Sequence, residues 1–194
     1  MRLSILAGLL AAASAFAEVN VYDIDSAHSS AQFSVRHMMV TNVRGQFSNV
    51  KGTVHYDPQN MGASRVDATI DVATVDTRET KRDTHLKTAD FFDVAKFPTM
   101  TFVSKRVMPA SPGKLKLLGD LTLHGVTKEV TLDVEGPAPE VKGQRGELRS
   151  GASATTRISR KEFGLTWNRA VETGGVAVSN EVVINIDVEL IRRK

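Results

Sequence analysis

The feature that most constrains the fold of this chain is a two-residue alternation of apolar and polar side chains, which recurs along most of its length. Arg65–Asp76 shows it most clearly, and its apolar positions are Val66, Ala68, Ile70 and Val72. Successive side chains of a strand point to opposite faces of a sheet. The alternation therefore predicts strands with one buried and one solvated face, as in antiparallel sheets.

About eight segments share this pattern, and no helix–strand alternation of the kind that builds parallel sheets accompanies them. A sandwich and a closed barrel both fit such a chain. Several segments run to nine or ten residues, and strands longer than the usual five or six favour the barrel. We therefore predict an all-β fold, an eight-stranded antiparallel barrel, whose lumen either is filled by side chains or holds one slender ligand.

The connections follow from turn chemistry. A hairpin is predicted for Leu115–His124 and Thr127–Gly136, with its turn at Gly125. Gly45 is interpreted as the centre of a bend, and the Pro/Gly-rich segment Pro137–Gly151 as a surface loop.

One segment, Thr77–Pro98, departs from the alternation. Its charged first part is followed by an aromatic cluster of Phe91, Phe92 and Phe97. Thr77 or Asp76 is suited to cap a helix, and Pro98 returns the chain to extended structure. We predict a short helical insert of one or two helices with an apolar underside. Such an insert acts either as a lid or only as a cover for one end of the barrel.

The N-terminal residues follow a different pattern. Arg2 precedes the apolar run Leu3–Ala13, and Ala15-Phe16-Ala17 resembles a cleavage signal, so residues 1–17 are predicted to be a secretory signal peptide. Residues 18–194 then form one domain, which we expect in the bacterial periplasm. The apolar run is too short to span a bilayer, and no later stretch is longer, so we expect no membrane-spanning segment.

Composition narrows the classes of partner. The 194 residues are 41% hydrophobic and 24% charged, which suits a folded core, and no cysteine is present for a disulfide framework. The net charge of +3 comes from interspersed acids and bases, so we expect no nucleic-acid partner.

Local motifs for catalysis or metal binding are weak. The chain has five histidines without a metal-ligand spacing, and we predict no metal site: His28, His37, His55, His85 and His124. No serine lies in a G-x-S-x-G motif. Arg82, Asp83 and His85 are close enough on a helix to form a polar network, which we interpret as tying the insert to the barrel rather than as catalytic.

An ordered set of short motifs nevertheless identifies a family. The motifs are Asp25-x-x-His28-Ser29, Phe33-x-Val35-x-His37, Gly45-x-Phe47, Arg82-Asp83-x-His85-Leu86, Asp90-Phe91-Phe92-Asp93, Phe97-Pro98, Gly119-x-Leu121-Thr122-Leu123-His124-Gly125-Val126-Thr127 and Arg160-x-x-Phe163-Gly164. In this order they resemble the YceI-like family of secreted bacterial proteins over Val19–Leu190. The resemblance implies a lipocalin-like barrel with a helical insert. It also implies a long isoprenoid, quinone or related amphiphilic lipid as ligand, and a capacity to form homodimers.

Candidate ligand-binding residues follow from the alternation and the resemblance together. The predicted lumen residues are Phe33, Val35, Ile70, Val72, Phe102, Leu121 and Leu123, with Phe91, Phe92, Phe163 and Trp167 near one end. The predicted polar rim consists of His28, His37, Arg82, Asp83 and His85. The small residues Ala31, Ala68, Gly119 and Ala154 share the apolar faces and favour a hollow barrel over a filled one.

The sequence thus predicts a periplasmic carrier that holds an amphiphilic lipid as cargo, with no catalytic residues and no cofactor. Two alternatives stay open. One is an enzyme that processes lipids or isoprenoid phosphates, and the other is a stress-related scaffold whose barrel is filled by its own side chains.

Overall fold

Eleven strands and one α-helix make up the part of the chain that the computed structural model describes, residues 19–170 and 174–194. The strands are β1 (Asn20–Ile24), β2 (Ser30–His37), β3 (Thr41–Phe47), β4 (Val50–Tyr56), β5 (Arg65–Asp71), β6 (Thr99–Ser111), β7 (Lys114–Leu123), β8 (Val126–Glu135), β9 (Val141–Lys142), β10 (Leu148–Ser159) and β11 (Val178–Arg192). The helix α1 is Thr80–Leu86, and three 3₁₀ helices are η1 (Met61–Ala63), η2 (Val72–Thr74) and η3 (Arg160–Phe163).

Three merged pairs of segments reduce the eleven strands to eight positions around a closed barrel: β1 with β2, β3 with β4, and β8 with the short β9, which continues it along the edge of β10. β1 and β2 flank a turn at Asp25–Ser29, and both pair with β11. β3 and β4 are likewise consecutive, β3 pairing with β2 and β4 with β1. Strands β5 to β8 follow in order, and β10 closes the ring by pairing with both β8 and β11. The predicted all-β, eight-stranded antiparallel barrel with a short helical insert is confirmed.

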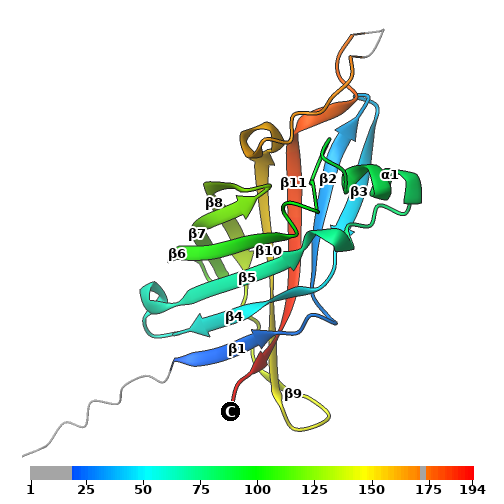
Figure 1. Ribbon diagram of the computed structural model, residues 1–194. Coiled ribbons are helices and arrows are strands. Elements are labelled where there is room, and N and C mark those ends of the chain that lie inside the picture. Colours follow the sequence, from blue (N-terminus) through cyan, green and yellow to red (C-terminus); the bar gives the residue numbers. More distant parts are fainter. Residues whose placement is uncertain (1–18, 171–173) are drawn as a thin grey trace, which may run out of the picture.

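The longest strand, β11, gives the barrel its length (Figure 1). It pairs with β10 from Ser159 opposite Glu181 to Arg149 opposite Ile191. At a rise of about 3.3 Å per residue, the fifteen residues of β11 span on the order of 50 Å. Figure 1 shows α1 beside β2 and β3 at one end, and β9 beside the C terminus at the other.

The apolar core lies inside the barrel because the inward-facing positions of the strands are apolar. One cluster, around Phe47, Met100 and Leu123, packs against residues of the insert. A second joins β1, β4 and β11, and a third joins β6, β7 and β8.

The insert between η2 and β6 contains a single seven-residue helix, α1, followed by turns. Its N-cap is Glu79, whose carboxylate accepts from the Lys81 N–H, and neither Thr77 nor Asp76 takes that position. The apolar underside packs on the core through Leu86, Phe92 and Val94. The insert therefore closes this end of the barrel.

Three local predictions are corrected by the structure. The strand predicted to reach Asp76 ends at Asp71, because the Asp71 carboxylate accepts from the Ala73 N–H and starts η2. Gly45 lies inside β3 instead of at a bend, and the turn of that hairpin is at Met38 and Met39. The predicted loop Pro137–Gly151 contains β9 and the start of β10.

The hairpin predicted around Gly125 is confirmed. Leu123 pairs with Val126, and His124 and Gly125 have φ values of 52° and 74°. The predicted signal peptide, residues 1–17, lies outside the described residues. Among the residues that are described, no helix is long and apolar enough to cross a membrane.

Candidate functional site

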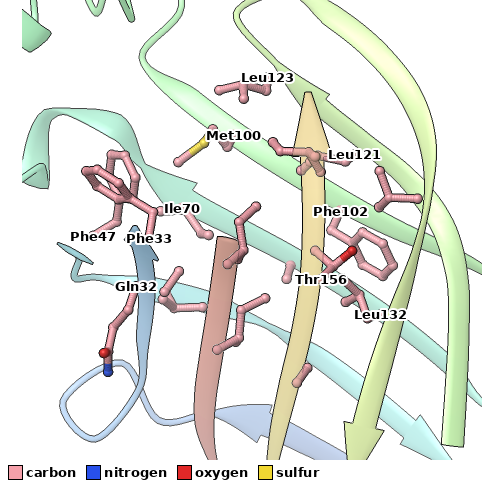
Figure 2. A pocket seen from close by; sticks show the side chains of 18 of the residues that line it. Gln32, Phe33, Phe47, Ile70, Met100, Phe102, Leu121, Leu123, Leu132 and Thr156 are labelled. Atoms are coloured by element: carbon pink, nitrogen blue, oxygen red, sulfur yellow. The ribbon is translucent and has the colours of Figure 1, made fainter. Parts of the chain in front are cut away.

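The barrel encloses an apolar cavity of about 410 Å³. In Figure 2, Ile70, Met100, Phe102, Leu121 and Leu132 come from the four strands β5 to β8 and surround a common space. Cavities of this size are typical of sites that bind small molecules. The barrel is therefore hollow in part, and its lumen is the candidate site.

The lumen is apolar because one face of each strand supplies it. β5 contributes Val66, Ala68 and Ile70, the even-numbered positions of its alternating sequence. In β11 the same phase continues over five positions, from Val182 to Leu190. The polar residues between them face outward, so the alternation that builds the barrel also makes its interior hydrophobic.

Two phenylalanine rings of the lumen lie against glycines of a neighbouring strand. A Cβ on Gly45 would lie 2.4 Å from Cζ of Phe33, and a Cβ on Gly119 would lie 2.5 Å from Cζ of Phe102. Any side chain at either glycine would displace the ring. Gly119 therefore seats an aromatic ring, whereas Ala31, Ala68 and Ala154 line the cavity itself.

Two hydroxyl groups of the lumen wall are hydrogen-bonded within the protein. The Thr156 hydroxyl donates to the Thr131 carbonyl at 2.8 Å. Nearer the β9 end, the buried Tyr22 hydroxyl donates to Glu140 at 2.7 Å. Burial, reinforced by this hydrogen bond, raises the pKa of Tyr22 to about 12. These two hydroxyls already have partners within the protein.

Arg160 fixes the segment that follows η3 at the α1 end of the lumen. Its side chain is buried and lines the cavity. The guanidinium donates to the carbonyls of Leu165 at 2.5 Å, Trp167 at 2.9 Å and Ser179 at 2.9 Å. Burial lowers the pKa of Arg160. Sequence analysis did not select this residue for the site, although the Arg160-x-x-Phe163-Gly164 motif contained it.

The buried Thr77 anchors α1 to the barrel. Asp83 accepts from the Thr77 N–H at 2.9 Å and from its hydroxyl at 2.5 Å. Arg82 donates to the same hydroxyl at 2.7 Å and to the Thr77 carbonyl at 2.9 Å. Arg82 and Asp83 thus hold α1 to Thr77, whose neighbour Asp76 pairs with Gln46 of β3, and this part of the predicted network connects the insert to the barrel. His85 does not join it, because its ring is bonded to Asp90. Arg82 also lines the cavity, but Asp83 does not.

Aromatic side chains close the same end of the lumen. The ring centroid of His85 lies 5.0 Å from that of Phe91 and 5.2 Å from that of Trp167, with edge-on geometry in both pairs. Phe91 and Trp167 are 5.0 Å apart. His85 Nε2 is hydrogen-bonded to the Asp90 carboxylate at 2.7 Å.

Most of the predicted lumen residues line the cavity, namely Phe33, Val35, Ile70, Phe102, Leu121, Leu123, Phe91, Phe92 and Trp167. Val72 and Phe163 lie outside it. Both are buried in the core cluster, because Val72 begins η2 after β5 has ended and Phe163 ends η3. Both side chains therefore pack beneath the wall of the barrel and do not face the lumen.

The predicted polar rim is divided between the two ends of the barrel. His37 and His85 line the cavity at the α1 end. His28 is exposed and hydrogen-bonded to Asp25, whose N–H donates to the Glu189 carbonyl. Since His37 is opposite Val178, the eleven residues to Glu189 along β11 separate these groups by about 36 Å.

Asp25, His28 and Glu189 also form a group with ligating atoms within 4.8 Å of one another. The guanidinium of Arg149 already donates to both Asp25 and Glu189, and it pairs with Glu147 at 2.8 Å. Arg149 therefore already balances part of the negative charge of this group, and its own positive charge disfavours a bound cation there.

Comparison with known proteins assigns the chain to a family. The model of the YceI-like domain matches residues 22–190. A UPF0312 protein of Staphylococcus aureus strain USA300 is 35% identical over 168 residues, covering 87% of this chain and 95% of the relative.

Solved structures share the fold. BcnA of Burkholderia cenocepacia superimposes with a TM-score of 0.73 at 25% identity, covering 86% of this chain and 98% of that protein. A domain from Saccharophagus degradans, described as polyisoprenoid-binding and implicated in plant cell wall breakdown, has a TM-score of 0.64 at 14% identity. It covers 91% of this chain and 100% of that domain, and its likeness concerns the fold alone.

Proposed function

Because the chain belongs to the YceI-like family and its barrel surrounds an apolar lumen, we propose that it binds one long-chain amphiphilic lipid and carries it through the periplasm. The ligand class is an isoprenoid, a quinone or a related lipid with a long apolar tail. The observation that carries the proposal is the cavity of about 410 Å³, which apolar side chains line almost throughout.

The magnitude of the hydrophobic effect supports a tail as the main source of affinity. Each buried CH₂ contributes about 0.8 kcal/mol, so ten carbons contribute on the order of 8 kcal/mol before the cost of immobilising the tail is subtracted. A hydrogen bond to a head group adds about 1–3 kcal/mol. The tail therefore sets affinity, and the head group sets orientation.

The distribution of polar side chains supports placing the head group at the α1 end. His37, Arg82 and His85 reach the lumen there, beside the aromatic rings of Phe91 and Trp167. At the β9 end the lining includes Tyr22, whose hydroxyl is already bound to Glu140. The tail then extends from the α1 end towards β9.

A carrier also accounts for the polar groups of the lumen better than an enzyme does. Thr156 and Arg160 are bound to backbone carbonyls, and Arg82 is bound to Thr77. Catalysis needs an acid, a base or a nucleophile that can exchange partners with a substrate. We therefore propose a binding function without turnover.

The periplasmic location is proposed from the N-terminal sequence. Residues 1–17 combine a basic start, an apolar run and a small-residue cleavage signal. A lipid with a long apolar tail needs a protein that shields the tail from water between membranes, and a closed apolar lumen provides this shielding.

Lipid analysis of three proteins tests the proposal. Wild-type protein, Ala68→Trp and Thr69→Trp are purified from the periplasm, and organic extracts are analysed by mass spectrometry. Ala68 faces the lumen, whereas Thr69 is its exposed neighbour on β5, so the two substitutions differ only in the face they modify. We expect a long-chain lipid with wild-type and Thr69→Trp proteins and its loss from Ala68→Trp.

Leu121→Trp provides a second lumen substitution if Ala68→Trp does not fold, and circular dichroism verifies the fold of each variant. A lipid that stays with both folded lumen variants would place the ligand elsewhere. Wild-type protein without any lipid, unable to take up an added isoprenoid or quinone, would support the filled scaffold instead.

A further inference from the structure

Exposed apolar side chains gather at one end of the barrel. Among the described residues, seven large apolar residues are exposed, and four of them belong to two adjoining segments: Met38, Met39, Val40 and Val176, with exposed fractions of 46%, 52%, 73% and 37%. The Met38 N–H donates to the Ala177 carbonyl at 2.8 Å, which joins the two segments. We call these four residues the apolar tip. The other three, Val19, Val103 and Val141, lie singly in other segments.

The turn between β2 and β3 has unusual residues for its backbone. Val40 N–H donates to the His37 carbonyl at 3.0 Å, and Met38 and Met39 have φ values of 47° and 62°. Positive φ at both central residues defines a type I′ turn, in which asparagine and glycine are strongly preferred. Two methionines are therefore unfavourable for the turn itself. Unfavourable residues that persist in a turn point to a role for their side chains.

The apolar tip adjoins residues that line the α1 end of the lumen. Figure 1 shows the turn between β2 and β3 at the end of the barrel that carries α1. His37, which lines the cavity, precedes Met38 in the chain, and Val178, which also lines it, follows Ala177. Arg160 donates to the carbonyls of Val178, which follows Ala177, and of Trp167. A lipid that enters or leaves the lumen at this end passes beside the tip.

Positive charge flanks the tip without acidic neighbours in the same hairpin. Ser30–Phe47 contains Arg36 and Arg44 but no Asp or Glu. Both arginines are exposed on the outward face of β2 and β3, since Arg36 pairs with Asn42 and Ser34 with Arg44. Within the described parts of the chain, neither arginine takes part in an ion pair.

We propose that the apolar tip docks the α1 end of the barrel onto the surface of an anionic phospholipid bilayer. Met38, Met39 and Val40 enter the boundary between head groups and acyl chains, and Arg36 and Arg44 bind lipid phosphates. Apolar side chains beside cations are the combination that holds proteins at such surfaces. An apolar tip of four exposed residues is too small for a stable protein interface, which buries about 800 Å² on each partner.

A single label measures this contact, because the chain contains no cysteine. Met39→Cys carries an environment-sensitive fluorophore on the tip, and Val141→Cys carries it in β9 at the opposite end. Each labelled protein is mixed with vesicles of phosphatidylglycerol and phosphatidylcholine or with vesicles of phosphatidylcholine alone. We expect a blue shift only for the Met39 label, only with the anionic vesicles, and less at high salt.

Vesicle co-sedimentation of unlabelled variants tests the residues. Met38→Asn combined with Met39→Gly supplies the preferred turn sequence, so it should keep or raise fold stability while it abolishes sedimentation. Arg36→Gln combined with Arg44→Gln removes two cations worth about 1 kcal/mol each at an anionic surface, a loss of about thirty-fold in affinity.

Equal sedimentation of wild-type protein and both variants would overturn the proposal, as would a shift of the Val141 label. A shift of the Met39 label on concentrating the protein without vesicles would instead show that a second copy covers the tip. Docking does not require a loaded lumen, so Ala68→Trp should still sediment. Its sedimentation separates failure of this proposal from failure of the carrier function.

Discussion

Replacing Gly119 by alanine tests the seating of Phe102, on which the shape of the lumen depends. The added Cβ would lie 2.5 Å from Cζ of Phe102 and 2.6 Å from the carbonyl oxygen of Val103. Such overpacking costs about 1–3 kcal/mol, whereas alanine in a strand regains about 0.5–1 kcal/mol of chain entropy relative to glycine. Overpacking wins, and we expect a net loss of about 1–2 kcal/mol.

Urea unfolding measures this loss as a shift of the midpoint at constant slope. Combining Gly119→Ala with Phe102→Leu removes the contact of the new methyl group with the ring but leaves its contact with the Val103 backbone. The second substitution should therefore restore only part of the lost stability. The double variant should then be about 1 kcal/mol more stable than the sum of the single changes predicts. Gly62→Ala is the matched control, because a Cβ there meets nothing closer than 3.5 Å.

The same substitution should also reduce ligand binding. The ring of Phe102 can escape the new methyl group only by turning into the lumen, whose wall it forms. A Gly119→Ala protein that is as stable as the wild type, or single changes that add without coupling, would refute the reasoning about the ring.

Three further predictions concern other parts of the chain. Export should remove residues 1–17, and the intact mass of the periplasmic protein should correspond to cleavage after Ala17; a retained segment would contradict the signal peptide. Phe91→Ala combined with Phe92→Ala should speed release of a bound fluorescent lipid several-fold because both rings line the lumen at the insert, whereas a change in stability alone would make the insert only a cover. Asp25→Asn should reduce the stability lost on acidification, as urea midpoints at pH 7 and pH 3 measure. The hydrogen bond with His28 holds the pKa of Asp25 below its usual value. The ionised carboxylate therefore stabilises the fold at any pH above the usual pKa of an aspartate, and this contribution is lost as the pH falls through the lowered pKa of the folded protein. An unchanged difference between the two midpoints would exclude this role.

Predictions from the sequence succeeded where structure depends on neighbours along the chain. The alternation in β5 placed Ala68 and Ile70 on the lumen face, and the glycine at position 125 located the hairpin of β7 and β8. Both inferences use only the period of a strand and the conformational freedom of a turn residue.

They failed where a distant residue decides the local conformation. Gly45 is required by the ring of Phe33 across the hairpin, and no pattern near Gly45 contains that information. Val72 continues the alternation but begins η2, because Pro98 opposite it accepts from the Val72 N–H and has no N–H to donate in return. His28 belongs to the opposite end of the barrel from His37 because β2 runs straight between them.

In the proposed carrier, the lumen holds the lipid tail in solution and the apolar tip allows its exchange at a membrane. Burial of the tail contributes on the order of 8 kcal/mol relative to its exposure to water. Release of the tail into water would therefore have to overcome this free energy. A bilayer removes this barrier, since the tail leaves one apolar environment for another. Docking the α1 end on a membrane, with Phe91 and Trp167 between lumen and tip, therefore lets a carrier bind its cargo strongly in solution and still exchange it at a surface. Lipid transfer between vesicles should accordingly be much faster with the wild-type protein than with the variant carrying Met38→Asn and Met39→Gly, while both retain the same amount of bound lipid in the absence of vesicles; equal transfer rates would show that exchange does not depend on the tip.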